Sequence, residues 1–253
     1  MSTTIPRGSV SMPDPVEGEP LDAPVTEPAL PPLVEGQRLD QPTFHARYEA
    51  MPPGTRAELI DGVVVMPSPL GHPHGRSHGP AVVWLMYYEE KTPGVETLDN
   101  TSTILGPRTE VQPDAQLRIL TECGGRTQAD RTFIRGVPEL VVEVAHTSRY
   151  VDLGPKLDSY ERAGVLEYIV RALEPDEIAW YVLQEGRLVK TPPDADGLYR
   201  SRAFPGLWLD PQALLARDTR RLREVIDLGV AAPGHAAFVA NLAAAKAQAG
   251  PTG

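Results

Sequence analysis

Two acidic residues and a lysine in the middle of the chain have the types and order that metal-dependent phosphodiester hydrolysis requires. Asp114 follows Gln112-Pro113, Glu143 lies inside the apolar run 140–145, and Lys156 comes next along the chain. An ionised carboxylate is unexpected in an apolar, β-prone run, because burying a charge without a partner is costly. Such a carboxylate is usually paired, protonated or bound to a cation, so this pattern indicates a functional site.

The chemistry that these residue types favour is hydrolysis assisted by a divalent cation. Such a cation neutralises charge on the phosphate and activates water. Mg²⁺ prefers oxygen ligands and takes one or two carboxylates together with water and substrate phosphate. We therefore expect Asp114 and Glu143 to meet at adjacent strand ends and bind Mg²⁺, or Mn²⁺ as its substitute, with the backbone carbonyl of Val144 as a third ligand. Lys156, about one turn into the next helix, is expected to deprotonate or orient the water.

The elements that must position these residues alternate without a regular βαβ rhythm, which predicts an α/β sandwich around a mixed sheet. We predict a hairpin at 58–66 with an Asp61-Gly62 turn, a central strand at 140–145 buried on both faces, and a helix at 151–162 ending before Gly164. Further strands are expected at 95–105, 115–120, 167–171, 177–184 and 187–190, a polar loop at 121–135, and helices at 43–50 (with Thr43 as N-cap), 76–91, 211–216 and 217–249.

Composition divides the chain into three parts. Residues 1–53 carry 11 of the 27 prolines, and residues 1–40 contribute −5 to the net charge of −10. Such a segment cannot bury enough apolar surface to offset the entropy of ordering it, so 1–40 is predicted to be a disordered Pro-rich acidic tail. Residues 41–216 are predicted to form one domain around one core, and 217–253 an Ala-rich C-terminal helical extension.

Several classes of protein are disfavoured. No apolar run reaches 18 residues, so we expect no membrane span, and the N-terminus lacks the pattern of a secretory signal. A single cysteine, Cys123, excludes an internal disulfide framework and fits a reducing cytoplasm. The acidic balance argues against a large basic surface for nucleic acid, although it leaves room for a local basic groove.

A histidine-rich segment, 72–78, precedes the second predicted helix. The spacing of His74 and His78 is that of zinc ligands on one helical face, but no Glu follows His74 and the helix is expected to begin only near Arg76. We favour a polar loop beside the active-site cleft; the alternatives are a role for His74 in binding substrate phosphate or in supporting a metal ligand, and a zinc site. Residues that could line the site or bind phosphate are Arg76, Arg126, Arg131, Arg135, Arg149, His146 and Ser148. Tyr160 and Tyr168 are expected in the core or at its rim.

Six segments in a fixed order resemble the Uma2 family of restriction-endonuclease-like proteins, within the PD-(D/E)XK nuclease superfamily. They are Glu58-Leu59-Ile60-Asp61-Gly62, His74-Gly75, Gln112-Pro113-Asp114, Pro138-Glu139-Leu140-Val141-Val142-Glu143-Val144, the Asp152…Lys156…Tyr160 helix, and Ala163-Gly164-Val165-Leu166-Glu167-Tyr168. The resemblance covers roughly 43–215. It implies a restriction-endonuclease-like core, a mixed β-sheet flanked by helices, with a Mg²⁺-dependent site in which Asp114 and Glu143 bind metal and Glu58 adds a further acid. It also implies a homodimer.

The chain departs from the superfamily pattern at one position. A lysine normally stands two residues after the second acid, and that residue here is Ala145. Lys156 would have to replace it from the following helix. We expect a cytoplasmic, Mg²⁺-dependent DNA endonuclease-like hydrolase. Ala145 and the net charge favour an alternative, a catalytically silent module of the same fold that binds a protein partner through the tail or the C-terminal helices. A hydrolase for a small phosphate ester would share the same site.

Overall fold

The computed structural model describes residues 30–67, 71–146 and 148–250. The described residues from Pro31 onwards form one compact unit. Most of the predicted acidic tail, residues 1–29, lies outside the described residues. Of its remainder, Leu33 is buried with Phe44, Leu59 and Val64, and Arg38 bridges to Val63. The division of the chain at 40 and 216 stays a prediction.

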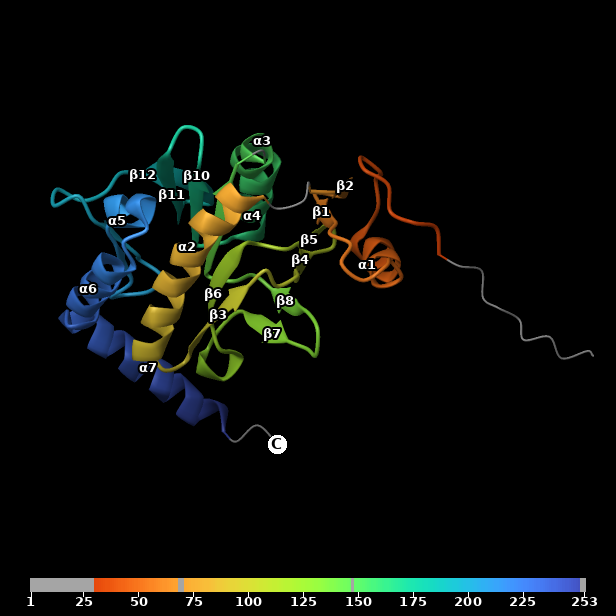
Figure 1. Ribbon diagram of the computed structural model, residues 1–253. Coiled ribbons are helices and arrows are strands. Elements are labelled where there is room, and N and C mark those ends of the chain that lie inside the picture. The colour runs from red at the N-terminus through yellow and green to blue at the C-terminus, as the bar shows by residue number, and fades with distance from the viewer. Residues whose placement is uncertain (1–29, 68–70, 147, 251–253) are drawn as a thin grey trace, which may run out of the picture. The chain divides into compact units, whose positions relative to one another are not determined.

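The larger part of the fold is built on a six-stranded central sheet (Figure 1). Its strands are β3 (Val95–Asp99), β6 (Ala115–Ile119), β9 (Leu140–Ala145), β10 (Glu167–Ala172), β11 (Glu177–Gln184) and β12 (Arg187–Thr191), in the spatial order β12-β11-β10-β9-β6-β3. β9 and β10 are parallel and the other neighbours are antiparallel. The predicted mixed sheet with a fully buried strand at 140–145 is therefore confirmed.

A second mixed sheet carries the predicted hairpin. Its strands are β1 (Glu58–Ile60), β2 (Val63–Val65), β4 (Thr103–Gly106), β5 (Thr109–Val111), β7 (Thr127–Ala129) and β8 (Ile134–Gly136), in the order β2-β1-β5-β4-β8-β7. Asp61 and Gly62 have φ of 48° and 79°, as a two-residue hairpin turn of this kind requires. β13 (Tyr199–Arg200) and β14 (Trp208–Leu209) form a separate two-stranded sheet.

Two predictions for this region were wrong. The single strand expected at 95–105 is divided between the sheets, because the chain turns at Asn100, whose φ is 46°. The polar loop expected at 121–135 contains a 3₁₀ turn, η1 (Thr121–Cys123), and most of the β7–β8 hairpin. Strands of three residues show too little alternation to be recognised in sequence.

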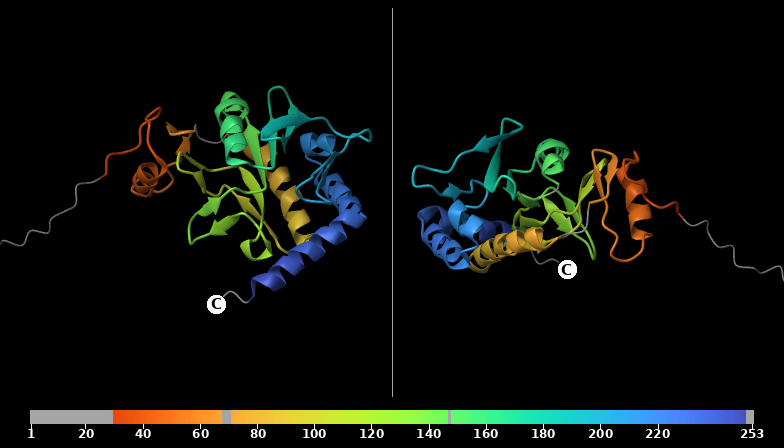
Figure 2. Two further views of the ribbon diagram at one scale, coloured as in Figure 1. Left: turned by 180° about the vertical axis from the view of Figure 1, so that it is seen from behind. Right: turned by 45° about the horizontal axis from the view of Figure 1, so that its top comes forward.

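Most helices cover the two faces of the central sheet, whereas the first helix packs on Leu59 and Val64 of the second sheet. The helices are α1 (Gln41–Glu49), α2 (His72–Lys91), α3 (Arg149–Val151), the π-helical turn η2 (Asp152–Lys156), α4 (Leu157–Ala163), α5 (Pro211–Ala216), α6 (Thr219–Val230) and α7 (Pro233–Ala249). Val142 and Ile169 face a core shared with α2, α5 and α6, whereas Val141 and Tyr168 face a core shared with α4. α2 lies between the central sheet and α6 (Figures 1 and 2).

Four helix predictions differ from the structure. The helix expected at 217–249 is divided into α6 and α7, because Pro233 disfavours helical geometry in Ala232 before it. α1 begins at Gln41, and its N-cap is Asp40 rather than Thr43. The Asp40 carboxylate accepts a hydrogen bond from the backbone N–H of Thr43 at 2.9 Å. α2 begins at His72 rather than near Arg76. The helix expected at 151–162 is interrupted at Gly154, because Pro155 has no N–H and disfavours helical geometry in the residue before it.

The C-terminal helices pack on the fold. Leu222 and Ile226 of α6 and Leu242 of α7 are buried in the core that contains α2. No single helix among the described residues is long and apolar enough to cross a membrane. α6 and α7 reach that length and composition only when taken together, and the chain bends by 75° between them.

Candidate active site

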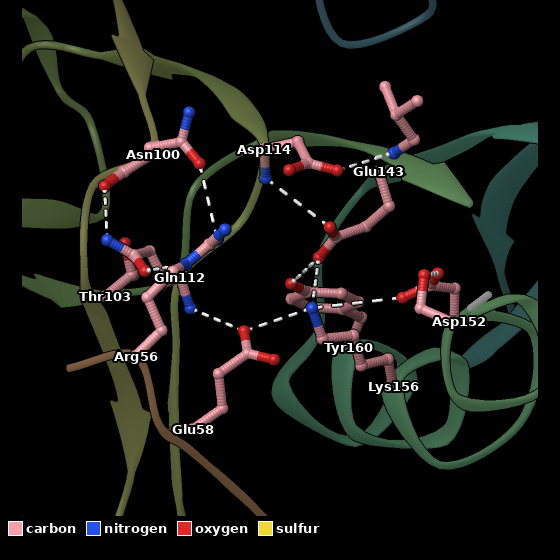
Figure 3. A network of polar contacts seen from close by, with 12 residues as sticks. Arg56, Glu58, Asn100, Thr103, Gln112, Asp114, Glu143, Asp152, Lys156 and Tyr160 are labelled. Carbon is pink, nitrogen blue, oxygen red and sulfur yellow. Dashed lines mark hydrogen bonds and ion pairs between the residues drawn. The ribbon is translucent and has the colours of Figure 1, made fainter. Parts of the chain in front are cut away.

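Asp114 and Glu143 lie side by side at one end of two paired strands (Figure 3). Asp114 directly precedes β6, and Glu143 lies in β9, its antiparallel neighbour. The backbone N–H of Asp114 donates to Glu143 Oε2 at 3.4 Å, and the N–H of Val144 donates to Asp114 Oδ2 at 2.7 Å. The two carboxylates, only 6% and 3% exposed, therefore converge as the sequence predicted.

Lys156 joins this pair from the opposite side. Its Nζ lies 2.9 Å from Glu143 Oε1, 3.0 Å from Glu58 Oε1 and 3.9 Å from Asp152 Oδ1. The side chain comes from the last residue of η2, directly after the interruption at Gly154. Lys156 thus points into the site, and Glu58 reaches it from the second sheet.

Tyr160 and His74 hold the carboxylates from either side. Tyr160 belongs to the core, as expected, and its hydroxyl also donates to Glu143 Oε1 at 2.9 Å. His74 Nε2 lies 3.1 Å from Asp114 Oδ2, and His78 Nε2 lies 2.8 Å from the Asp114 carbonyl. The polar loop favoured for 72–78 was wrong: both histidines lie on α2 and share a face. The spacing of His74 and His78 does place both side chains on one helical face, but they contact Asp114.

The site has more negative than positive charge. Three buried carboxylates, those of Glu58, Glu143 and Asp152, lie within 3.9 Å of the ammonium of Lys156, and the buried carboxylate of Asp114 lies next to Glu143. Burial raises the pKa of Glu143 well above its usual value, although Lys156 opposes the shift. Burial likewise raises the pKa of Asp152. The surplus must be neutralised by protons or by a bound cation, because buried unpaired charge is costly.

Two other groups keep their charge. Burial acts to lower the pKa of Lys156, but the charges of Glu143, Glu58 and Asp152 outweigh it and raise that pKa well above the usual value. Burial acts to raise the pKa of Asp114, but the hydrogen bond and charge of His74, with the Val144 N–H, lower it overall. The site therefore presents a charged lysine and an ionised aspartate.

A cavity of about 260 Å³ opens onto these groups. Asp114, Glu58, Lys156, His74 and Ser148 line it. The five arginines singled out in the sequence do not line it, and three of them pair with acids elsewhere: Arg126 with Glu139, Arg135 with Asp130 and Arg149 with Glu177. His146 does not line it either.

Sequence analysis missed the arginine that does line the cavity, Arg56. A signal for it was available. Arg56 stands two residues before Glu58, the first residue of β1, and side chains two apart in an extended chain face the same side. Glu58 was singled out and its neighbour on the same face was not.

The donor set can be tested for a divalent cation. Asp114 Oδ2 accepts two hydrogen bonds, while Oδ1 accepts none from the described residues, and Glu143 Oε2 has only the 3.4 Å contact. The N–H and C=O of a strand residue share one edge, so the Val144 carbonyl lies on the same edge as the N–H bound to Asp114. No three His, Cys, Asp or Glu side chains in the described parts of the chain are grouped as a metal site. A cation here would need the Val144 carbonyl and water, as Mg²⁺ often does.

Comparison with known proteins bears on this arrangement. The profile of the family described as "Uma2: Putative restriction endonuclease" matches residues 42–212. The chain belongs to the Uma2 family. The resemblance drawn from the six motifs is thus confirmed, and the matched region contains Glu58, Asp114, Glu143 and Lys156. Membership in Uma2 supports a nuclease-like function.

The remaining comparisons add less. No curated protein matches the chain. Among solved structures, it is similar to "a putative nuclease belonging to DUF820" from Anabaena variabilis ATCC 29413, with 13% sequence identity and a TM-score of 0.47. That similarity covers 72% of this chain and 97% of the other.

Proposed function

We propose that this Uma2 protein is a Mg²⁺-dependent endonuclease that hydrolyses phosphodiester bonds of DNA. The observation that carries the proposal is the convergence of Asp114 and Glu143, joined by the hydrogen bond from the Asp114 N–H to Glu143 Oε2, with Lys156 on the second Glu143 oxygen. Two buried acids that converge, with a lysine beside them, are the groups that metal-assisted phosphodiester hydrolysis needs.

The metal ligands in this proposal are Asp114, Glu143 and the carbonyl of Val144, with Mn²⁺ as a substitute for Mg²⁺. The surplus of negative charge favours a divalent cation at this position. When bound, the cation neutralises charge on the phosphate and acidifies the attacking water.

The side chains of the chain have separate tasks. His74 and the Val144 N–H orient Asp114, and Tyr160 orients Glu143. Three carboxylates keep Lys156 protonated, so its Nζ donates a hydrogen bond that orients the water or a phosphate oxygen. Of the two roles expected for Lys156, orientation of water is the one that this charge state favours. Glu58 holds Lys156 in place and accepts the Gln112 N–H at 2.7 Å.

Cleavage of supercoiled plasmid DNA tests the proposal. The wild-type protein is expected to nick or linearise the plasmid with Mg²⁺ or Mn²⁺ and not with EDTA. Asp114→Ala and Glu143→Gln are expected to lose this activity. Glu224→Gln, which removes an exposed carboxylate of α6, is expected to retain it.

Equal cleavage by wild type, Asp114→Ala and Glu143→Gln would reject the proposal. A silent interaction module would give no cleavage and no Asp114-dependent heat on titration with Mn²⁺. Hydrolysis of bis(p-nitrophenyl) phosphate without cleavage of DNA would instead indicate a small phosphate ester as substrate. The cytoplasmic location, the homodimer and a protein partner at the C-terminal helices stay predictions.

A further inference from the structure

Arg56 lines the cavity in an unusual setting. The residue is half-buried, and its guanidinium is held by two amide oxygens: Nε donates to Gln112 Oε1 at 3.1 Å, and Nη2 donates to Asn100 Oδ1 at 3.4 Å (Figure 3). Neutral acceptors fix the orientation of a guanidinium without cancelling its charge. The group therefore remains able to bind an anion through its remaining N–H groups.

The two amides are themselves held by the site. Gln112 Nε2 donates to the Asn100 carbonyl at 2.8 Å, and the Gln112 N–H donates to Glu58. The Asn100 N–H donates to the Asp114 carbonyl at 3.2 Å. Asn100 has a φ of 46°, which asparagine tolerates better than most residues. The orientation of Arg56 is thus tied directly to the segment that presents Asp114.

The charges of the cavity make Arg56 distinctive. Among the described residues that line it, Lys156 and Arg56 are the two with permanently cationic side chains. Lys156 is surrounded by Glu143, Glu58 and Asp152. Arg56 is then the cation at this cavity whose described partners leave its charge uncompensated. A substrate anion that enters beside four carboxylates needs such a group.

We propose that Arg56 binds a phosphate group of the nucleic-acid strand, beside the phosphate that reacts at Asp114 and Glu143, and that Gln112 and Asn100 are its positioning residues. This inference rests on the proposed function, because it assigns Arg56 to the same substrate. The planar guanidinium suits a phosphate since it can donate two parallel hydrogen bonds to it.

Binding of a fluorescein-labelled DNA duplex tests this assignment by fluorescence anisotropy. Ca²⁺ replaces Mg²⁺, and a gel verifies that the duplex stays intact. Arg56→Gln is expected to weaken binding about tenfold or more, and to lower the slope of log K against log salt concentration by about 0.9. Arg56→Lys keeps the charge but loses the two parallel N–H donors of the guanidinium. Its affinity for DNA is therefore expected to lie between those of the wild type and Arg56→Gln.

Two further variants separate this role from folding and from general charge. Gln112→Glu places a carboxylate against Arg56 Nε, so binding is expected to weaken although Arg56 is still present. Arg220→Gln removes an arginine whose side chain is 90% exposed on α6, and is expected to stay within about twofold of wild type with an unchanged salt slope.

The outcomes also separate this inference from the proposed function. Wild-type affinity in Arg56→Gln and Gln112→Glu, losses no larger than in Arg220→Gln, or no binding by the wild type would each overturn the assignment of Arg56. Binding that depends on Arg56, without Mg²⁺-dependent cleavage, would retain the assignment and reject the endonuclease. Mg²⁺-dependent cleavage that does not depend on Arg56 would support the endonuclease and reject the assignment of Arg56.

Discussion

Lys156 Nζ lies 2.9 Å from Glu143 Oε1, so a residue of a broken helix completes a site in the central strand of the sheet. Ala145, two residues after Glu143, faces the same side of β9 as Glu143 and packs in the core there. An alanine leaves that face to Lys156, which arrives from η2. Although residue 145 is an alanine, the second acid, Glu143, therefore still contacts a lysine.

Lys156→Met is expected to destabilise the fold. Removal of the ammonium leaves Glu143, Glu58 and Asp152 buried without their cation, and breaking a buried pair in this way costs about 3–5 kcal/mol. Urea unfolding of the wild type and the variant measures the loss. The double variant Lys156→Met/Glu143→Gln should lose less than the sum of its single variants, because one unpaired charge is removed. Strict additivity of the two losses would show that the pair does not interact.

His74→Ala is expected to weaken Mn²⁺ binding. His74 orients the Asp114 carboxylate from α2, and loss of such a supporting hydrogen bond typically costs about 10- to 100-fold in metal affinity. Isothermal titration calorimetry measures the affinity. His72→Ala, an exposed position on the same helix, serves as the control and should bind like wild type. Equal affinities of all three proteins would contradict a supporting role for His74.

Substitution of two helix glycines by alanine should change the stability of the protein in opposite directions. A Cβ on Gly229 of α6 would lie 2.1 Å from the Gly206 carbonyl oxygen and 3.0 Å from Trp208 Cγ, so Gly229→Ala should destabilise by about 1–3 kcal/mol. A Cβ on Gly75 of α2 meets nothing within 4 Å. Gly75→Ala should stabilise by about 0.5–1 kcal/mol. Thermal unfolding of both variants checks the signs; a neutral Gly229→Ala would mean that α6 does not approach Gly206 closely.

The stability of the protein should fall in mild acid through His235. Burial lowers the pKa of His235, whose Nε2 lies 2.9 Å from Thr92 Oγ1. With a folded pKa below the unfolded value of about 6.5, this residue contributes its stability above that pH and loses it as pH falls through the folded pKa. Melting temperatures between neutral and mildly acidic pH should fall less in His235→Asn than in wild type. Parallel pH profiles of the two proteins would rule this out.

The sequence predicted which acids and which lysine meet at the site better than it predicted the residues that support them. Glu143 was recognisable because a charge in the apolar strand 140–145 is anomalous, and Asp114 because of its motif. The continuous apolar pattern also predicted β9 as a central strand. The second sheet was recognised at its hairpin, where the Asp61-Gly62 turn marks two short strands. β5, β7 and β8 are equally short, with three residues each, and have no such turn beside them.

The missing parts of the site depend on tertiary contacts. Arg56 acquires its setting from Gln112 and Asn100, which are 56 and 44 residues away in the chain. His74 reaches Asp114 because α2 begins at His72, the first residue of the segment expected to be a loop, with Pro73 in its first turn, where a proline is compatible with a helix. Local sequence carries neither relationship.

A crystal soaked with Mn²⁺ would show whether Asp114 and Glu143 hold one cation between them. One anomalous scattering peak is expected within coordination distance of Asp114 Oδ1, Glu143 Oε2 and the Val144 carbonyl, and it should be lost in Asp114→Ala. A Mn²⁺ peak elsewhere, or an unchanged peak in Asp114→Ala crystals, would contradict the binding of one cation by Asp114 and Glu143.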